Sequence, residues 1–199
     1  FLKRNNDKII SQPIKGTIKR SKDPKEDEVL KNTLLKDPKE QAENVMIVDL
    51  VRNDLSRFAK KGSVKVEELF GIYSFPQVHQ MISTVSCNPE ENVKFVEILK
   101  STFPMGSMTG APKIRALELI EKYEKTKRGV YSGSIGYIKA NGDFDFNVII
   151  RSMLYNKSSK YLSFITGSAI TDICDPEYEY NECLLKASAM IQLLTKNKN

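Results

Sequence analysis

Two pairs of glutamates share one spacing in this sequence. Glu40 and Glu43 lie in one predicted helix, and Glu179 and Glu182 lie in another. Residues three apart lie on one face of a helix, so two such helices facing each other would present four carboxylates to a hard cation such as Mg²⁺. Acidic pairs on lysine-rich helices are also typical of a solvated surface, and the spacing alone does not separate these interpretations.

Two basic side chains could carry catalysis. Lys15 lies in the stretch PIKGT, where proline and glycine frame a predicted turn with apolar neighbours. Partial desolvation there would favour a neutral, nucleophilic amine, and a surface lysine is the alternative. His79, the single histidine, lies in a strand-like run. It is either a general acid or base near neutral pH or a structural histidine.

Three further features could hold an anion. The loop 106–110 precedes Pro112 and would direct backbone N–H groups toward an anion at the start of a helix, although it lacks the Lys-Ser/Thr ending of a P-loop. Gly167 allows close backbone approach or marks a bulge at a strand end. Arg151 follows an apolar run, and its planar guanidinium could clamp a carboxylate or form a cross-strand ion pair.

The elements that must position these side chains include several helices. Apolar residues recur at helical spacing, and prolines stand at first-turn positions. This pattern predicts helices that begin at Pro24, Pro38 and Pro112, and others at about 90–101 and 176–195.

Strands lie between these helices. An apolar run predicts a strand at 78–85. Asn141-Gly142 predicts the turn of a hairpin between strands at 134–139 and 145–155, and a third antiparallel strand is predicted at 161–166. Strands grouped between helices without regular βαβ alternation indicate an α+β fold, with antiparallel β-sheet layers and flanking helices.

The composition is that of a globular protein. The 199 residues include 31 Lys and Arg against 25 Asp and Glu, and 40% are hydrophobic, which argues against disordered and fibrous classes. Basic residues are mixed with acidic ones and no nucleic-acid-binding motif occurs, so we expect no nucleic-acid partner. No apolar run of about 18 residues occurs, so we expect no membrane segment and a cytoplasmic location. The three cysteines lack regular spacing, which favours reduced thiols over disulfides or a zinc site.

The order of the motifs resembles that of the chorismate-utilising enzyme family, which includes anthranilate synthase component I, aminodeoxychorismate synthase component I, isochorismate synthase and salicylate synthase. Seven ordered blocks are far more specific than any single motif. They are PIKGT at 13–17, AENVMIVDLVRNDLSR at 42–57, VHQMISTV at 78–85, MGSMTGAPKIRALELI at 105–120, RGVYSGSIGY at 128–137, DFNVIIRSMLY at 145–155 and ITGSAITDICDPEYEYNECLLKA at 165–187. The resemblance implies the fold of that family, with residues 1–199 as the C-terminal portion of a single catalytic domain whose upstream segment is absent.

The middle residue of the PIxGT block separates activities in that family. Anthranilate synthases resemble PIAGT and aminodeoxychorismate synthases resemble PIKGT, so Lys15 implies Mg²⁺-dependent amination of chorismate to 4-amino-4-deoxychorismate, toward 4-aminobenzoate and folate. In the implied mechanism, Lys15 attacks ring carbon 2 while the carbon-4 hydroxyl leaves, and ammonia then adds at carbon 4 and expels the lysine. The alternatives are anthranilate synthase component I, isochorismate or salicylate synthase and, in a different class, a non-catalytic fragment or interaction module.

The resemblance also implies roles for residues at matching positions. His79 and Ser107 would join Lys15 as catalytic residues near the departing hydroxyl, with His79 assisting its protonation. Tyr131 and Arg151 would hold the enolpyruvyl carboxylate of the substrate.

The remaining implied roles concern the ring carboxylate, the metal and the partner protein. Gly167 would donate its backbone N–H to the ring carboxylate, and Lys186 would balance the acidic cluster. Mg²⁺ would lie among the four glutamates, with Glu43 and Glu182 as direct ligands and Glu40 and Glu179 beside them. Because no cysteine-based glutaminase signature occurs here, the implied partner is a glutamine amidotransferase subunit that delivers ammonia.

Overall fold

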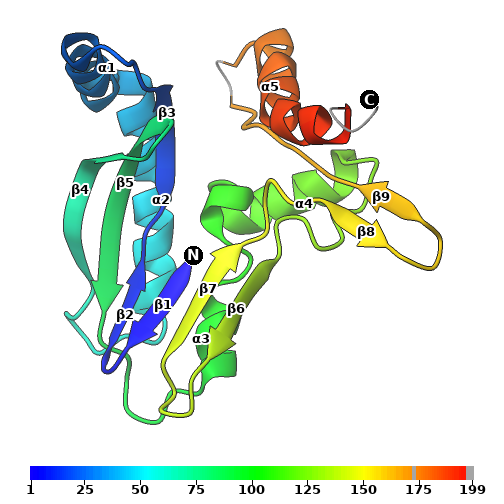
Figure 1. Cartoon of the computed structure of the whole chain (residues 1–199). Coiled ribbons are helices and arrows are strands. Elements are labelled where there is room, and N and C mark those ends of the chain that lie inside the picture. Colours follow the sequence, from blue (N-terminus) through cyan, green and yellow to red (C-terminus); the bar gives the residue numbers. More distant parts are fainter. Residues whose placement is uncertain (172–173, 196–199) are drawn as a thin grey trace. The chain divides into compact units, whose positions relative to one another are not determined.

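A computed structural model describes residues 1–171 and 174–195 and has antiparallel strands with flanking helices, so the α+β prediction is confirmed (Figure 1). These residues divide into two compact units. The first comprises Phe1–Lys125 and Gly136–Asn147, and the second comprises Thr126–Ile135 and the described residues from Val148 onward. Each unit carries part of the predicted site.

Helices α1 (Pro24–Lys36) and α2 (Pro38–Ser56) begin at the predicted prolines. An aspartate precedes each proline, and its carboxylate accepts hydrogen bonds from backbone N–H groups of the first turn. These caps are Asp23 and Asp37, so proline at the first helical position and a side-chain cap together fix both starts. The cap at Asp37 includes the N–H of Glu40 and thereby holds the turn that carries this glutamate.

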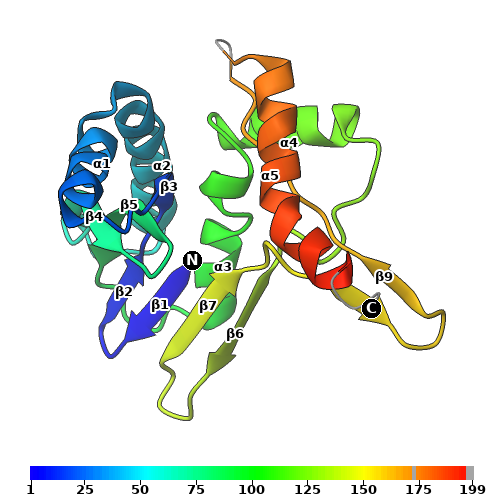
Figure 2. The ribbon, with the colours of Figure 1, turned by 45° about the horizontal axis from the view of Figure 1, so that its top comes forward.

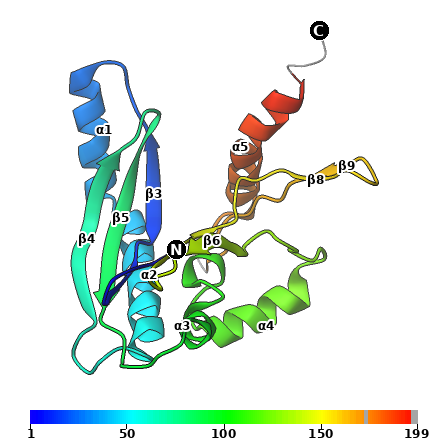
Figure 3. The ribbon, with the colours of Figure 1, turned by 60° about the horizontal axis from the view of Figure 1, so that its bottom comes forward.

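The strands of the large sheet are β1 (Leu2–Asn5), β2 (Lys8–Ser11), β3 (Ile14–Lys19), β4 (Lys65–Ser74), β5 (Val78–Cys87), β6 (Ser134–Ile138) and β7 (Phe144–Val148). Within the described residues they form one seven-stranded sheet in the order β3-β5-β2-β1-β7-β6, with β4 paired to β5. Strand β5 is central because it pairs antiparallel with β2, β3 and β4. Figure 3 shows α1 and α2 against β3, β4 and β5.

The stretch PIKGT is a strand rather than the predicted turn. It forms most of β3, which pairs with β5 through Ile14 and Thr17 and has an irregular register between them. Gly16 lies in this irregularity with a φ of +89°, a conformation that glycine adopts without a steric penalty. The proline and glycine therefore mark a distorted strand, in which pairing to β5 outweighs the local preference for a turn.

The predicted hairpin at Asn141-Gly142 is confirmed, because it joins β6 to β7. The predicted strand at 145–155 is wrong in its extent: β7 ends at Val148, and β8 (Leu154–Asn156) starts after an interruption. Arg151 lies in this interruption with a φ of +50°, which a strand does not accommodate.

The third predicted strand pairs antiparallel with the end of the second as predicted, but it is shorter than expected and the pair lies outside the large sheet. Strand β9 (Tyr161–Ser163) pairs with β8 and forms a two-stranded ribbon separate from the large sheet (Figure 2).

The core of the first unit includes residues of the sheet, α2 and α3 (Phe95–Thr102). Three phenylalanines pack edge-on or stacked in it, with ring centroids 5.1 Å apart for Phe95 and Phe144 and 5.3 Å apart for Phe95 and Phe146. Helix α3 starts later than the predicted residue 90, because Asn92 has a φ of +67° and the helix forms only beyond it.

The remaining helices are the single-turn η1 (Gly106–Met108), α4 (Lys113–Tyr123) and α5 (Pro176–Thr195). Helix α4 begins one residue after Pro112, which serves as its cap residue, and α5 occupies the predicted range. Among the described residues, no helix combines the length and the apolar character needed to cross a membrane.

Candidate active site

In the first unit, Lys15 lies close to the two glutamates of α2. Lys15 Nζ lies 3.1 Å from Glu43 Oε2, and the two side chains are only 21% and 19% exposed. Glu40 lies one turn earlier, close to the backbone of Gly16. Burial raises the pKa of Glu40, and the charge of Glu43 adds to this effect. A partly desolvated amine and two carboxylates therefore share the space between β3 and α2.

A buried polar contact holds α2 against β5 beside these glutamates. The Ser83 hydroxyl donates to Asn44 Oδ1 at 2.6 Å, and the Phe70 N–H donates to Ser83 Oγ at 3.0 Å. Among the described residues, the Asn44 amide nitrogen is buried without a hydrogen-bond partner. Because Asn44 follows Glu43 directly, this contact also fixes the part of α2 that faces Lys15.

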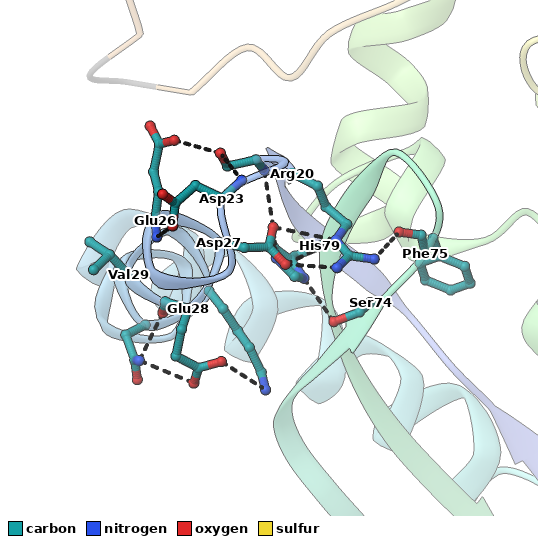
Figure 4. Close-up of polar contacts among 12 residues, drawn as sticks. Arg20, Asp23, Glu26, Asp27, Glu28, Val29, Ser74, Phe75 and His79 are labelled. Atoms are coloured by element: carbon teal, nitrogen blue, oxygen red, sulfur yellow. Dashed lines mark hydrogen bonds and ion pairs between the residues drawn. The ribbon is translucent and has the colours of Figure 1, made fainter.

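His79 is buried, and protein groups engage both of its ring nitrogens (Figure 4). Nε2 lies 3.0 Å from Asp27 Oδ1, and Nδ1 lies 2.8 Å from Ser74 Oγ. Arg20 binds the same aspartate through two of its nitrogens. Hydrogen bonds from Arg20 and also from His79 lower the pKa of Asp27 to about 2, although desolvation opposes them. The acid role of His79 stays a prediction.

The aspartate and arginine beside His79 were missed by the sequence reasoning. Asp27 lies in a run of charged residues that looks like a solvated helix face, and Arg20 lies just beyond a short strand. A spacing rule could not have found them, because Asp27 and His79 are 52 positions apart.

Ser107 lies in η1, within the loop that leads to α4. A buried ion pair anchors the end of this loop, where Lys113 Nζ lies 2.5 Å from Asp54 Oδ2 on α2. Burial raises the pKa of Asp54, and the adjacent Lys113 opposes this rise. Gly106 packs against Leu50 of the same helix. The structure thus ties the Ser107 loop to α2, the helix that also carries Glu43.

In the second unit, four of the predicted residues come together around α5. Lys186 Nζ lies 3.1 Å from Glu182 Oε1 and donates to the Gly167 carbonyl oxygen at 3.1 Å. The Ser168 hydroxyl contacts the Oε2 atoms of both Glu179 and Glu182. Burial favours a higher pKa for Glu182, but hydrogen bonds from Ser168 and Lys186 lower it below its usual value. Ser168 was missed by the sequence reasoning, although it directly follows Gly167.

Tyr131 joins this group and Arg151 does not. A Cβ placed on Gly167 would lie 2.7 Å from the Tyr131 hydroxyl oxygen, so the two residues are in close contact and a larger residue at 167 would displace the tyrosine hydroxyl. Arg151 is exposed in the segment between β7 and β8. The proposed carboxylate-binding role of this pair therefore stays a prediction.

The donor chemistry of the acidic residues fits Mg²⁺. Each unit offers one pair of carboxylates, and carboxylate oxygens are the protein ligands that this ion prefers. In residues 1–171 and 174–195, no group of three or more His, Cys, Asp and Glu side chains is gathered as a metal site. A single pair is compatible with Mg²⁺, which uses one or two carboxylates together with water and substrate oxygens.

Comparisons with known proteins agree with the family resemblance. Residues 1–192 match the profile of a family described as chorismate binding enzyme. The chain is 44% identical over 190 residues to a probable chloroplastic aminodeoxychorismate synthase from Oryza sativa subsp. japonica, covering 95% of this chain and 21% of that protein. It is 40% identical over 196 residues to aminodeoxychorismate synthase component 1 of Escherichia coli strain K12, covering 98% of this chain and 43% of that protein.

Anthranilate synthases are similar to the chain as well. Identity to anthranilate synthase component 1 of Aquifex aeolicus is 40% over 187 residues, covering 94% of this chain and 37% of that protein. The crystal structure of anthranilate synthase component I from Streptococcus pneumoniae TIGR4 superposes with a TM-score of 0.83 at 35% identity. The match covers 95% of this chain and 41% of that chain. The chain thus spans less than half the length of each of these relatives.

Proposed function

The chain belongs to the chorismate-binding enzyme family, and on that premise we propose that it acts as the catalytic part of an aminodeoxychorismate synthase. The reaction would be the amination of chorismate to 4-amino-4-deoxychorismate. The observation that carries this proposal is the position of Lys15, a largely buried amine on β3 that lies 3.1 Å from Glu43. A nucleophile held in this way can form a covalent intermediate and divide one difficult substitution into two.

In the proposed mechanism, Lys15 Nζ forms a bond to ring carbon 2, the two ring double bonds shift, and the bond from carbon 4 to its hydroxyl breaks. The proton lost by the Lys15 nitrogen balances the proton that the departing hydroxyl takes up as water. Ammonia then bonds to carbon 4 and loses a proton, the double bonds return, and the Lys15 nitrogen takes up a proton as its bond to carbon 2 breaks. Ser107 is proposed to lie near the departing hydroxyl and to donate a hydrogen bond to it.

The attacking amine must be neutral, whereas Lys15 Nζ lies at ion-pair distance from Glu43. We propose that Glu40, Glu43, Glu179 and Glu182 hold Mg²⁺, with Glu43 and Glu182 as direct ligands. Bound Mg²⁺ would offset the charge of the ring carboxylate and of Glu43, which weakens the hold of Glu43 on the lysine.

The second unit is proposed to bind the carboxylates of the substrate. Gly167 lies between the Tyr131 hydroxyl and the Lys186 ammonium. Its backbone N–H would donate to the ring carboxylate, and Tyr131 and Arg151 would hold the enolpyruvyl carboxylate. The ammonia would come from a glutamine amidotransferase subunit, a proposal that agrees with the designation "component 1" of the E. coli relative.

The alternative function is that of an anthranilate synthase, and the similarity to the Aquifex and Streptococcus proteins favours it as the second candidate. In that reaction ammonia would attack carbon 2 directly, with no lysine adduct. The two functions therefore differ in whether Lys15 is required.

The test incubates the chain with chorismate, Mg²⁺ and an ammonium salt, and identifies products by chromatography and mass spectrometry. We expect 4-amino-4-deoxychorismate, loss of product in Lys15→Ala, and a covalent substrate adduct on Lys15 in acid-quenched protein. Lys19→Ala is the matched control, because Lys19 is an exposed lysine of the same strand. Anthranilate as product, or an unchanged product in Lys15→Ala, would assign the alternative. Absence of both turnover and stabilisation by chorismate with Mg²⁺ would favour a non-catalytic module.

A further inference from the structure

Four elements of the first unit meet at the His79 side chain (Figure 4). His79 lies on β5, Asp27 on α1 and Ser74 at the end of β4, while Arg20 directly follows β3. Arg20 Nη2 lies 2.7 Å from Asp27 Oδ2, and His79 Nε2 lies 3.0 Å from Asp27 Oδ1. These residues form a connected polar group, which we call the His79 hub: Arg20, Asp27, Ser74 and His79.

The hydrogen bonds of the hub define the state of the imidazole. The carboxylate of Asp27 is ionised at neutral pH, since its pKa is about 2, so it can only accept hydrogen bonds. Nε2 must therefore carry the hydrogen that faces Asp27, and in the neutral ring Nδ1 accepts from the Ser74 hydroxyl. The side chain of His79 is only 2% exposed. Neither nitrogen can exchange a proton with a substrate unless it gives up one of these contacts.

The hub also holds the strand that carries Lys15. Arg20 Nη1 donates to the Phe75 carbonyl at 3.3 Å, and the Arg20 N–H donates to the Gln77 carbonyl at 3.1 Å. The end of β3 is thereby bound to the turn between β4 and β5 as well as to α1. The other part of the strand is held by the contact of Lys15 with Glu43.

We infer that His79 is a positioning residue that acts through the hub on β3 and Lys15, and that it does not donate a proton to the substrate. The part of this inference that concerns Lys15 rests on the proposed function, whereas the state of the ring does not. The hub joins β3, α1, β4 and β5 around the buried His79 side chain, so its loss would loosen the strand on which the nucleophile lies. A positioning role also explains why the only histidine is placed where solvent does not reach it.

The first test is spectroscopic and independent of activity. Because the chain contains a single histidine, its ring nitrogens give unambiguous signals in a long-range ¹H–¹⁵N spectrum of the labelled chain. We expect the neutral ring to be the Nε2–H tautomer, and we expect that hydrogen to exchange slowly with solvent. Asp27→Asn should accelerate the exchange, and Asp49→Asn should not, because Asp49 forms an exposed ion pair with Arg52 on α2. The Nδ1–H tautomer, or rapid exchange of the ring hydrogen in the unmodified chain, would refute the hydrogen-bond arrangement of the His79 hub.

The second test separates positioning from proton transfer. His79→Gln can still donate a hydrogen bond to Asp27, whereas His79→Phe cannot. If His79 is a positioning residue, we expect kcat of His79→Gln to stay within about tenfold of the unmodified chain, with an unchanged pH profile. We expect a larger fall in kcat for His79→Phe. If His79 is instead a proton donor, kcat should fall by about 100-fold or more in both variants, and one limb of the pH profile should disappear. If the unmodified chain makes no product, the proposed function fails. The spectroscopic test still shows whether the hydrogen bonds of the His79 hub are formed.

Discussion

Gly16 is the position where a single methyl group should disturb both the fold and the site. Its φ of +89° costs an alanine about 1–2 kcal/mol. An added Cβ would also lie 3.1 Å from Leu34 Cδ1, 3.2 Å from Glu40 Oε2 and 3.3 Å from Met81 Cβ. Leu34 Cδ1 and Glu40 Oε2 lie at the ends of side chains and can shift. The Met81 Cβ cannot, because the backbone of β5 fixes it. Overpacking of this kind costs about 1–3 kcal/mol, so we expect Gly16→Ala to lose about 2–5 kcal/mol.

Gly62→Ala provides the matched control for this prediction. Gly62 has a similar φ of +76°, but nothing lies within 4 Å of its added Cβ. It should lose only the backbone contribution of about 1–2 kcal/mol. Both glycines lie in the first unit, so urea unfolding followed by circular dichroism reports the same structure in both variants. Equal losses in the two variants would refute the crowding at Gly16, and no loss in either would refute the backbone argument.

Three further predictions concern buried or paired groups. Lys113→Met should destabilise the chain by about 3–5 kcal/mol in urea unfolding, because it leaves the buried Asp54 carboxylate without its partner, and adding Asp54→Asn should restore part of this loss. The pKa of Asp27 is lowered from 3.8 to about 2, chiefly by its arginine partner, so its stabilisation is complete above about pH 4 and is lost as pH falls through about 2. Asp27→Asn should therefore flatten the acid limb of a stability-against-pH curve, and an unchanged limb would contradict the assignment. Burial raises the pKa of the Cys87 thiol to about 11, so at pH 8 Cys87 should react with a maleimide much more slowly than the partly exposed Cys183, as peptide mass mapping would show.

The features that sequence reasoning predicted correctly depend on local chemistry. Helices α1 and α2 start where proline follows an aspartate, and the hairpin turns at Asn141-Gly142. In each case residues within one turn determine the backbone conformation. The glutamate pairs belong to this class as well, because a spacing of three places two side chains on one helix face whatever the rest of the fold does.

The features that sequence reasoning missed depend on distant partners. The strand at PIKGT forms because β5 pairs with it, and this pairing outweighs the local turn signal of proline and glycine. The Asp27–His79 contact joins residues on different elements, and nothing in the sequence distinguishes Asp27 from the other acidic residues of α1. Ser168 likewise acquires its contacts only when α5 brings the two glutamates beside it.

The charges of the two units bear on the Mg²⁺ proposal. In the first unit, one glutamate of the pair contacts a lysine at 3.1 Å, as Glu43 does with Lys15. In the second unit, Glu182 contacts Lys186 at the same distance. The other glutamate of each pair has no lysine partner among the ion pairs of the described residues. Each unit therefore offers one carboxylate that is paired with a lysine and one that is not, and such a pair suits Mg²⁺, which takes one or two protein carboxylates together with water and substrate oxygens.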